Sequence, residues 1–378
     1  MNMAPSIHFP SSYQESREEF LEQFQVIKRI WPDARLENQP VSAEDDLKIE
    51  WIAADSLGTP QKVLIITCGV HGIEGFVGAA MRSLFLDQFL NGLDPQTTGL
   101  YLVHAINPWG MDHKRRVTRN NVDLNRNFVL NEDAFQIEIN PDYQLYDPNL
   151  NPERPLRPLW KEIPNVVGSM TGYLLRNGLT NIRNAVLQGQ RFNPAGIYSS
   201  GNGYEPETLI MMDLIQEIFA HYPDALLIDL HTGYGPKYQM CILNSPREKR
   251  GGDQLAEDFQ YPLVLKADPE DFYIMQGDMV DWLYQYRRAS GMAGNFYAAA
   301  FEFGTIGNAI HHEFISLWNM IFENQAHRFG TVDPRTMKRI RRIFWEMFIP
   351  SEKKWREKAL ADCWRGFAGV LKAEGYIK

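Results

Sequence analysis

The chain contains few cysteines and no long apolar run. Its three cysteines, Cys68, Cys241 and Cys363, lie far apart and form no CxxC pair. This usage suits free thiols in a reducing compartment, so the cytoplasm is the expected location. No stretch of about 18 apolar residues is present, and residues 1–20 have neither a basic nor an apolar leader segment. The sequence therefore predicts no membrane span and no signal peptide.

The chain also lacks an excess of positive charge. Lysine and arginine number 38 against 47 aspartates and glutamates, which gives a formal net charge of −9. This balance argues against nucleic acid or an anionic membrane as the main partner. Repeats and low-complexity tracts are absent too, and 44% hydrophobic residues are enough for a sizeable core. We expect one domain over residues 1–378, and the sequence leaves the oligomeric state open.

Residues 62–78, KVLIITCGVHGIEGFVG, are the most informative stretch. Residues 63–66 form a short apolar run typical of a buried parallel strand. His71 and Glu74 follow at a spacing of three, and a helical pattern begins at Phe76. A strand, a Gly-rich turn and a helix place both side chains at the carboxyl end of the strand, where open α/β sheets build their sites. Both are zinc ligand types, although a lone HxxE motif also occurs by chance.

Further segments with strand or helix periodicity surround this stretch. Residues 47–54 alternate in polarity, which predicts a half-buried strand paired with residues 62–68. Other strands are expected at residues 99–105, 225–230, 238–243, 261–265 and 297–303. Helices are expected at residues 13–31, 75–90, 165–187, 206–220, 277–288, 310–328, 333–348 and 351–373. This mixture of strands and helices indicates an α/β fold.

Residues 107–128, NPWGMDHKRRVTRNNVDLNRNF, are the second informative stretch. They carry five cations in an acidic chain: Lys114, Arg115, Arg116, Arg119 and Arg126. A solvated loop is the ordinary explanation of such a charge run. However, Asn125 and Arg126 stand between apolar residues, and Asp123 is fixed beside them. The pattern therefore favours a pocket for an anionic group, with Asp123 placed to support a metal ligand.

One later strand repeats the pattern of the first, and another carries a carboxylate. The strand at residues 225–230 runs into His231 and then into glycines. The strand at residues 297–303 carries Glu302, a carboxylate that cannot be left unpaired cheaply in apolar surroundings. A buried ion pair is the structural alternative for Glu302. A core histidine or a helix cap is the alternative for the metal-ligand candidates.

Four motifs in a fixed order, HGIE, VDLNRNF, DLH and FEFGT, resemble those of the zinc carboxypeptidase family, in particular its bacterial carboxypeptidase-like branches. Aspartoacylase and succinylglutamate desuccinylase are related to that family. The resemblance covers roughly residues 45–305. It implies a single mixed, mostly parallel twisted sheet flanked by helices. A long inserted loop region at residues 130–205 and a C-terminal helical layer at residues 310–373 would be added to this core.

The resemblance also implies residue roles. His71, Glu74 and His231 would bind one zinc ion per chain and leave a position open for water. Asp123 would orient His71, and Glu302 would be the general base.

Three further residues match the family's substrate-binding groups. Arg116 matches the arginine that stabilises the oxyanion. The family's common asparagine two residues later is Thr118 here, and the extra Arg119 is a rival to Arg116. Asn125 and Arg126 match the pair that binds the substrate's terminal carboxylate, Arg126 as a bidentate fork.

The segment YIMQGDMVDWLY aligns with a fifth family stretch. It places the family's mobile phenol at Tyr273, for which a packed loop tyrosine is the alternative, and the floor of the side-chain pocket at Val280. An uncharged floor would favour an apolar terminal side chain over a basic one. Asp278 and Asp281 would reverse this preference if either turned inward, but helical spacing from Val280 predicts that both point elsewhere.

The leading hypothesis is a zinc metallopeptidase, a carboxypeptidase-like hydrolase that removes the C-terminal residue of a small peptide through a zinc-activated water. An aspartoacylase-like amidohydrolase of small N-acyl amino acids is the first alternative. A metal-free binding module on the same fold is the second. The insertion at residues 130–205, with its Gly-rich part at 188–203, is expected to narrow access to the zinc.

Overall fold

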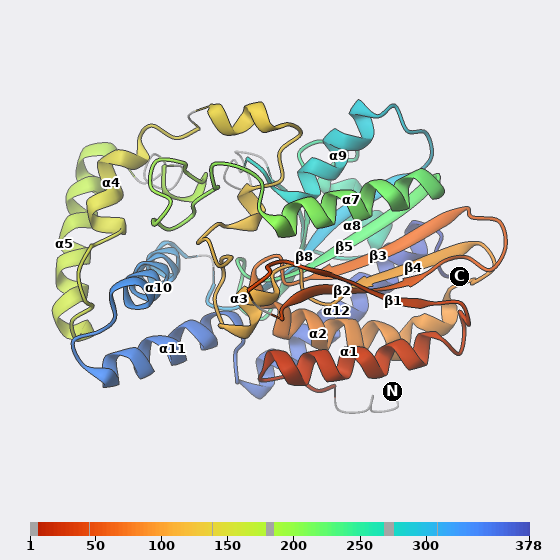
Figure 1. The fold of residues 1–378 in the computed structure, drawn as a ribbon, viewed down its shortest axis with the longest axis horizontal. Helices are drawn as coiled ribbons and strands as arrows, with labels where there is room; N and C mark the ends of the chain where they lie inside the picture. Colours follow the sequence, from red (N-terminus) through yellow and green to blue (C-terminus); the bar gives the residue numbers. More distant parts are fainter. Residues whose placement is uncertain (1–6, 45, 138, 179–184, 268–275, 308) are drawn as a thin grey trace.

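The computed structural model describes residues 7–44, 46–137, 139–178, 185–267, 276–307 and 309–378. In these ranges one eight-stranded sheet has the order β1-β2-β4-β3-β5-β8-β6-β7 (Figure 1). The strands are β1 Arg35–Pro40, β2 Lys48–Ala54, β3 Lys62–Cys68, β4 Thr98–Val103, β5 Asp224–Gly233, β6 Met240–Asn244, β7 Val264–Lys266 and β8 Phe296–Gly304. Four of the seven neighbouring pairs are parallel. The predicted α/β fold with a single mixed, mostly parallel sheet is confirmed.

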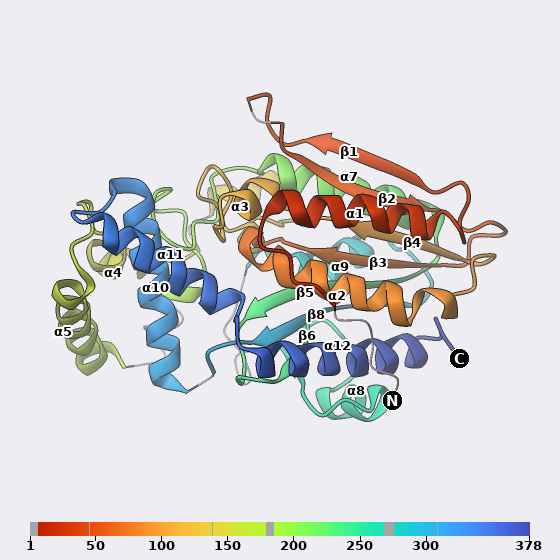
Figure 2. The same cartoon turned by 90° about the horizontal axis from the view of Figure 1, so that it is seen from below.

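Helices cover both faces of the sheet. One face carries α1 Tyr13–Ile27, α2 Gly75–Gln88, α8 Gly252–Phe259 and α12 Lys353–Ala373. The other face carries α7 Pro206–His221 and α9 Met279–Ala289. Beyond the carboxyl ends of the central strands lie α4 Tyr143–Leu150, α5 Leu159–Asn177, α10 Ile310–Phe329 and α11 Pro334–Phe348 (Figure 2). No helix in the described part of the chain is long and apolar enough to cross a bilayer.

Strand β3 is buried on both sides, which explains its uninterrupted apolar sequence. Val63 and Ile65 pack in the core under α7 and α9, whereas Leu64 and Ile66 pack in the core under α1, α2 and α12. Successive side chains of a strand point to opposite faces, so a strand between two helical layers needs apolar residues at every position. Two separate hydrophobic cores thus fix β3 and the residues that follow it.

The predicted pairing of residues 47–54 with residues 62–68 is wrong. Strand β2 pairs antiparallel with β1 and β4, and β3 lies between β4 and β5. Strand β1 was not predicted because its sequence, RLENQP, is polar and ends in proline. An edge strand tolerates both features, since one side of its backbone faces solvent.

The inserted region at residues 130–205 contains helices as well as loops. Helix α5 starts at Leu159, earlier than the predicted start at residue 165, and it continues through Pro164. Helix α4, which contains Pro148, was not predicted. The insertion joins the C-terminal helices: Leu156 bridges to Thr331, and Gln325 Nε2 donates to Arg154 O at 2.9 Å. Helix α12, the last of the C-terminal helices, packs on the sheet beside α2 and α8.

Gly72 allows the HGIE turn to lie directly on the short helix α3, Pro108–Asp112. A Cβ atom at this position would lie 2.2 Å from Gly110 C and 2.3 Å from Met111 N, which are both backbone atoms. The side chain of any other residue would push α3 away from the turn.

We therefore expect Gly72→Ala to lower the free energy of unfolding by about 1–3 kcal/mol, the usual cost of overpacking. Urea unfolding would measure it. Gly168→Ala is the matched control, because a Cβ atom there meets nothing within 4 Å and alanine is the better helix former. Equal stability of the two variants would contradict the close contact.

Candidate metal centre

The register of three parallel strands brings the predicted site residues together. Cys68 at the end of β3 is paired with Leu230 in β5, and His231 in β5 is paired with Glu302 in β8. His71 and Glu74 follow β3 in a short 3₁₀ turn at Gly72–Glu74. The strands run in the same direction, so all four side chains lie at one edge of the sheet.

The backbone of residues 69–74 is held by the segment that follows β4. Gly69 has φ +72°, a conformation that favours glycine, and its carbonyl accepts from Asn107 N at 2.8 Å. Gly72 N and Ile73 N donate to the carbonyls of Arg116 and Arg115, at 3.1 and 2.8 Å. The HGIE turn and the basic stretch at residues 107–128 are therefore built as one unit.

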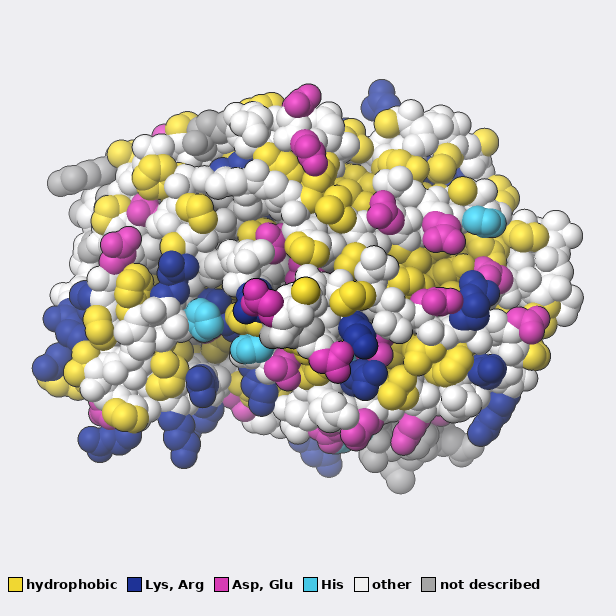
Figure 3. All heavy atoms as spheres, in the orientation of Figure 1, with side chains coloured by type: hydrophobic (Ala, Val, Ile, Leu, Met, Phe, Trp, Pro, Cys, Tyr) yellow, Lys and Arg dark blue, Asp and Glu magenta, His cyan; other side chains and the backbone are white. Residues whose placement is uncertain are grey.

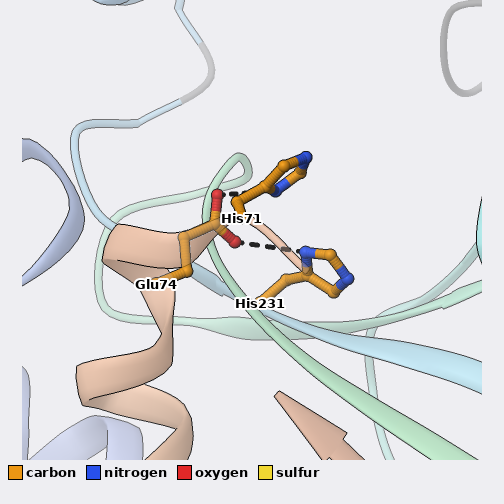
Figure 4. A group of neighbouring side chains, drawn as sticks. All are labelled: His71, Glu74 and His231. Carbon is orange, nitrogen blue, oxygen red and sulfur yellow. Dashed lines mark hydrogen bonds and ion pairs between the residues drawn. The ribbon is translucent and has the colours of Figure 1, made fainter. Parts of the chain in front are cut away.

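Glu74 points one carboxylate oxygen at each of the two histidines (Figure 4). Its Oε1 is 2.9 Å from His71 Nδ1, and its Oε2 is 3.1 Å from His231 Nδ1. One ligand atom from each residue lies within 4.8 Å of the other two, and all three residues are buried. This is the geometry of three protein ligands converging on one point.

A carboxylate on the far side of each ring sets its orientation. His71 Nε2 is 3.0 Å from Asp123 Oδ1, and His231 Nε2 is 2.5 Å from Asp229 Oδ2. Asp229 is held in turn by Thr67 Oγ1, which donates to its Oδ1 at 2.7 Å. Carboxylates in this position fix the tautomer of a ligating histidine. Sequence reasoning assigned this role to Asp123 but missed Asp229, although the DLH motif contains it.

The donor set fits zinc chemistry. The carboxylates beside Nε2 favour a proton there, so the Nδ1 lone pairs of His71 and His231 point at the oxygens of Glu74. Two such acceptors facing a carboxylate repel unless a proton or a cation lies between them. The Nδ1 atoms of His71 and His231 lie 2.9 and 3.1 Å from these oxygens, and all three residues are buried. A divalent cation held by two imidazoles and one carboxylate satisfies all three groups.

The charges around Glu74 alter the pKa values of the site. Burial raises the pKa of Glu74, but the charges and hydrogen bonds of His71 and His231 outweigh it and lower this pKa overall. Asp123 is also buried, yet Arg116, Arg126 and His71 hold its pKa well below the usual range. Burial lowers the pKa of His231, but Asp229 and Glu74 raise it by more. The pKa of His231 therefore lies well above its usual value. The carboxylates are thus ionised and attract a cation.

Glu302 shares the cavity with these ligands. Tyr234 N donates to its Oε1 at 3.0 Å, which fixes the carboxylate. Burial, and secondly the negative charge of Glu74, raise the pKa of Glu302 to about 8. A cation at the ligands would lower this pKa again, because it offsets the charge of Glu74.

The cavity in front of the ligands has a volume of about 140 Å³. It is smaller than the pockets of about 300–1,000 Å³ that hold drug-sized ligands. Much of its apolar wall comes from the insertion and the C-terminal helices: Leu187, Tyr198, Leu317, Met320, Met347 and Phe348. Leu243 of β6 and Ala300 of β8 add to it from the sheet. Its charged lining comes from Glu74, Arg116, Asp278, Glu302 and Glu313, besides the two histidines.

The structure brings Arg116, not Arg119, to the site. Arg116 Nη1 lies 3.0 Å from Glu74 Oε1, and Arg116 Nε lies 3.2 Å from Asp123 Oδ2. Arg119 is exposed and pairs with Glu44 at 2.6 Å. Of the two arginines, Arg116 is therefore the one that lines the cavity.

Of the pair predicted to bind a terminal carboxylate, Asn125 and Arg126, only one residue lines the cavity. Asn125 lines the cavity. Arg126 is completely buried and is not among the described residues that line it. Its Nε and Nη2 donate to Leu187 O at 3.2 and 2.8 Å, and its Nη1 donates to Asn125 O at 3.0 Å. The Arg126 guanidinium, which was predicted to bind the substrate's carboxylate, thus binds backbone carbonyls instead.

Tyr273 lies outside the described residues, and Val280 requires a correction. Val280 is 4% exposed and packs in the core under α7 and α9, away from the cavity lining. Asp278 lines the cavity instead. The cause is the start of α9: Asp278 is its N-cap and accepts from Asp281 N at 2.8 Å, so the first turn buries Val280. Burial raises the pKa of Asp278.

A protein-family model described as "Protein of unknown function (DUF2817)" matches residues 9–362. The chain belongs to this family. None of the curated proteins compared with this DUF2817 chain matches it.

Several solved structures resemble the DUF2817 chain at low sequence identity. Bovine thrombin-activatable fibrinolysis inhibitor, in complex with tick carboxypeptidase inhibitor, is 15% identical with a TM-score of 0.47; 87% of this chain and 98% of that chain are covered. Carboxypeptidase A from Helicoverpa armigera is 16% identical, with a TM-score of 0.46 and coverages of 93% and 74%. Murein-tripeptide amidase MpaA from Escherichia coli O157 is 19% identical, with a TM-score of 0.37 and coverages of 77% and 92%. Similarity this low does not establish what the DUF2817 chain acts on.

We expect near-stoichiometric zinc in the purified protein, and we expect His231→Ala to lose most of it, because that change removes one of three ligands. Elemental analysis would measure the bound metal. His221→Ala is the control, since His221 is exposed on α7. Full metal content in the His231 variant would contradict the ligand assignment.

Proposed function

We propose that this chain is a zinc-dependent hydrolase that cleaves an amide bond in a small peptide or peptide-like substrate. The observation that carries this proposal is the buried group His71, Glu74 and His231, with Glu302 beside His231 in the next strand. Three protein ligands leave a further position open, which is the mark of a catalytic rather than a structural zinc site. A carboxylate placed next to such a site is the usual partner for water activation.

His71, Glu74 and His231 would hold the metal. Zinc bound there supplies a Lewis acid that polarises a carbonyl and lowers the pKa of water. Glu302 accepts the proton of the attacking water, and Tyr234 N keeps its carboxylate in place. The same carboxylate then donates that proton to the leaving nitrogen. This shuttle lets one residue act as base and then as acid.

Arg116 is proposed to stabilise the negative charge that develops on the carbonyl oxygen. Its guanidinium lines the cavity and is held between Glu74 and Asp123. Two carboxylates on one guanidinium restrict its rotation, so its position is set before substrate binds. A preorganised donor of this kind contributes more than a mobile one because no reorganisation is needed.

The small cavity favours short substrates. Removal of one terminal residue from a peptide and deacylation of a small N-acyl amino acid both fit its volume of about 140 Å³. A series of N-acyl amino acids and C-terminally varied peptides of increasing length would separate them. An activity confined to N-acyl amino acids would favour the second reaction.

Glu302→Gln is expected to keep zinc and the fold while kcat falls at least about 10²-fold, the lower range for loss of a general base. Steady-state kinetics together with metal analysis would measure this. Glu18→Gln, an isosteric change on the exposed face of α1, should leave kcat unchanged. Near-normal turnover by a zinc-loaded Glu302 variant would refute the role.

The insertion is expected to limit substrate size, because Leu187 and Tyr198 form part of the cavity wall. Short peptides should be cleaved, whereas large folded proteins should resist in a degradation assay. The same proteins treated with a nonspecific protease are the control for intrinsic susceptibility. Efficient degradation of folded proteins would count against a narrow entrance.

A further inference from the structure

The insertion at residues 130–205 covers the buried side chain of Arg126. Its guanidinium donates to the carbonyl of Leu187, with the Tyr198 ring 5.9 Å from it. Leu187 and Tyr198 also line the cavity, so they stand between Arg126 and any ligand. A carboxylate that required this arginine would have to displace two hydrogen bonds within a fully buried contact.

This cover is part of the fold. Asp123 N donates to Ser199 O at 2.8 Å, and Asn127 Nδ2 donates to Ser200 O at 2.8 Å. On the other side, Gly277 packs against the Arg126 backbone, where a Cβ atom would lie 2.3 Å from Arg126 O. Residues 187–200 and 277 therefore enclose the arginine from two directions. Groups bonded in this way are costly to expose.

The cavity lining carries more negative than positive charge. Its described carboxylates belong to Glu74, Asp278, Glu302 and Glu313, whereas its arginine is Arg116. Zinc and the ligand histidines balance Glu74, and Arg116 is held by Glu74 and Asp123. Figure 3 shows Lys and Arg gathering elsewhere, over α11 and the nearby end of α5. Asp278 is a further carboxylate of this lining that a ligand can contact.

Asp278 presents its carboxylate beside Asn125. Its Oδ2 accepts from Asn125 Nδ2 at 2.7 Å while its Oδ1 caps helix α9. Each carboxylate oxygen has two lone pairs, so a ligand N–H can be accepted without breaking either bond. The position that the sequence assigned to carboxylate binding thus offers a negative charge.

Resting on the proposed function, we propose that the leaving part of the substrate carries an ammonium group or a similar cationic hydrogen-bond donor. The carboxylate of Asp278 accepts a hydrogen bond from this donor. A free terminal carboxylate is not needed for binding. The substrate class is an amide whose released amine bears a second positive charge, such as a C-terminal lysyl or ornithyl residue in amidated form.

Two sets of compounds test this on the zinc-loaded full chain. The first is four N-acylated dipeptides with Lys or norleucine as the leaving residue, each as a free acid and as a carboxamide. The second is the four matching leaving groups: lysine, lysinamide, norleucine and norleucinamide. Hydrolysis is measured as kcat/KM, and binding of the leaving groups is measured by calorimetry.

Lys compounds should exceed norleucine compounds by about tenfold, the size of one hydrogen bond to a charged group. Carboxamides should equal or exceed their free acids. Asp278→Asn should remove most of the Lys preference in both assays while the helix stays capped, because asparagine is an equally good N-cap. Asp281→Asn is the matched control; Asp281 bonds Ser245 at 2.6 Å and is not part of the described cavity lining.

The outcomes separate the two proposals. A free acid preferred over its carboxamide by tenfold or more, or a norleucine preference, would overturn the cationic-substrate inference and leave the hydrolase intact. Failure to cleave any of the four dipeptides, with lysinamide still bound through Asp278, would overturn the hydrolase alone. An unchanged Lys preference in a folded, zinc-loaded Asp278→Asn variant would overturn the role of Asp278.

Discussion

The arrangement of the site depends on one carboxylate shared by four partners. Glu74 faces His71 and Arg116 with Oε1, and it faces His231 and Thr232 N with Oε2. These partners come from segments that are distant in sequence, so Glu74 joins the β3 turn, the basic stretch and β5. Because the group is buried, its charges must balance locally. A divalent cation held by the two histidines and Glu74 would complete that balance.

The parts of the site that follow directly from strand ends could be predicted from the sequence. His71, Glu74, His231 and Glu302 each come just after, or near the end of, an apolar strand, and parallel register then brings them together. Local pattern is sufficient there because the sheet itself sets the geometry. The fold class was predictable for the same reason, whereas the polar edge strand β1 gave no hydrophobic pattern to read.

The parts that depend on distant contacts could not be predicted. Arg126 lies in the expected motif, but the insertion supplies the carbonyl of Leu187 that binds its guanidinium. Asp278 lines the cavity and Val280 is buried, the reverse of the prediction, because helix α9 begins one residue after Asp278. A shift of two residues at a helix start changes an apolar wall into a charged one. Motif spacing contains no information on either event.

Much of the cavity wall belongs to two parts of the chain that are far apart in sequence yet joined in space. The insertion contributes Leu187 and Tyr198, and helices α10 and α11 contribute four apolar side chains. The two parts are bonded where Leu156 bridges to Thr331 and where Asn324 Nδ2 donates to Ala195 O at 2.9 Å. A lengthened or shortened insertion would lose these bonds unless the C-terminal helices changed with it. Insertion length and the α10–α11 turn should therefore vary together among chains of this architecture, and each such pair would define a different cavity in front of the same metal ligands.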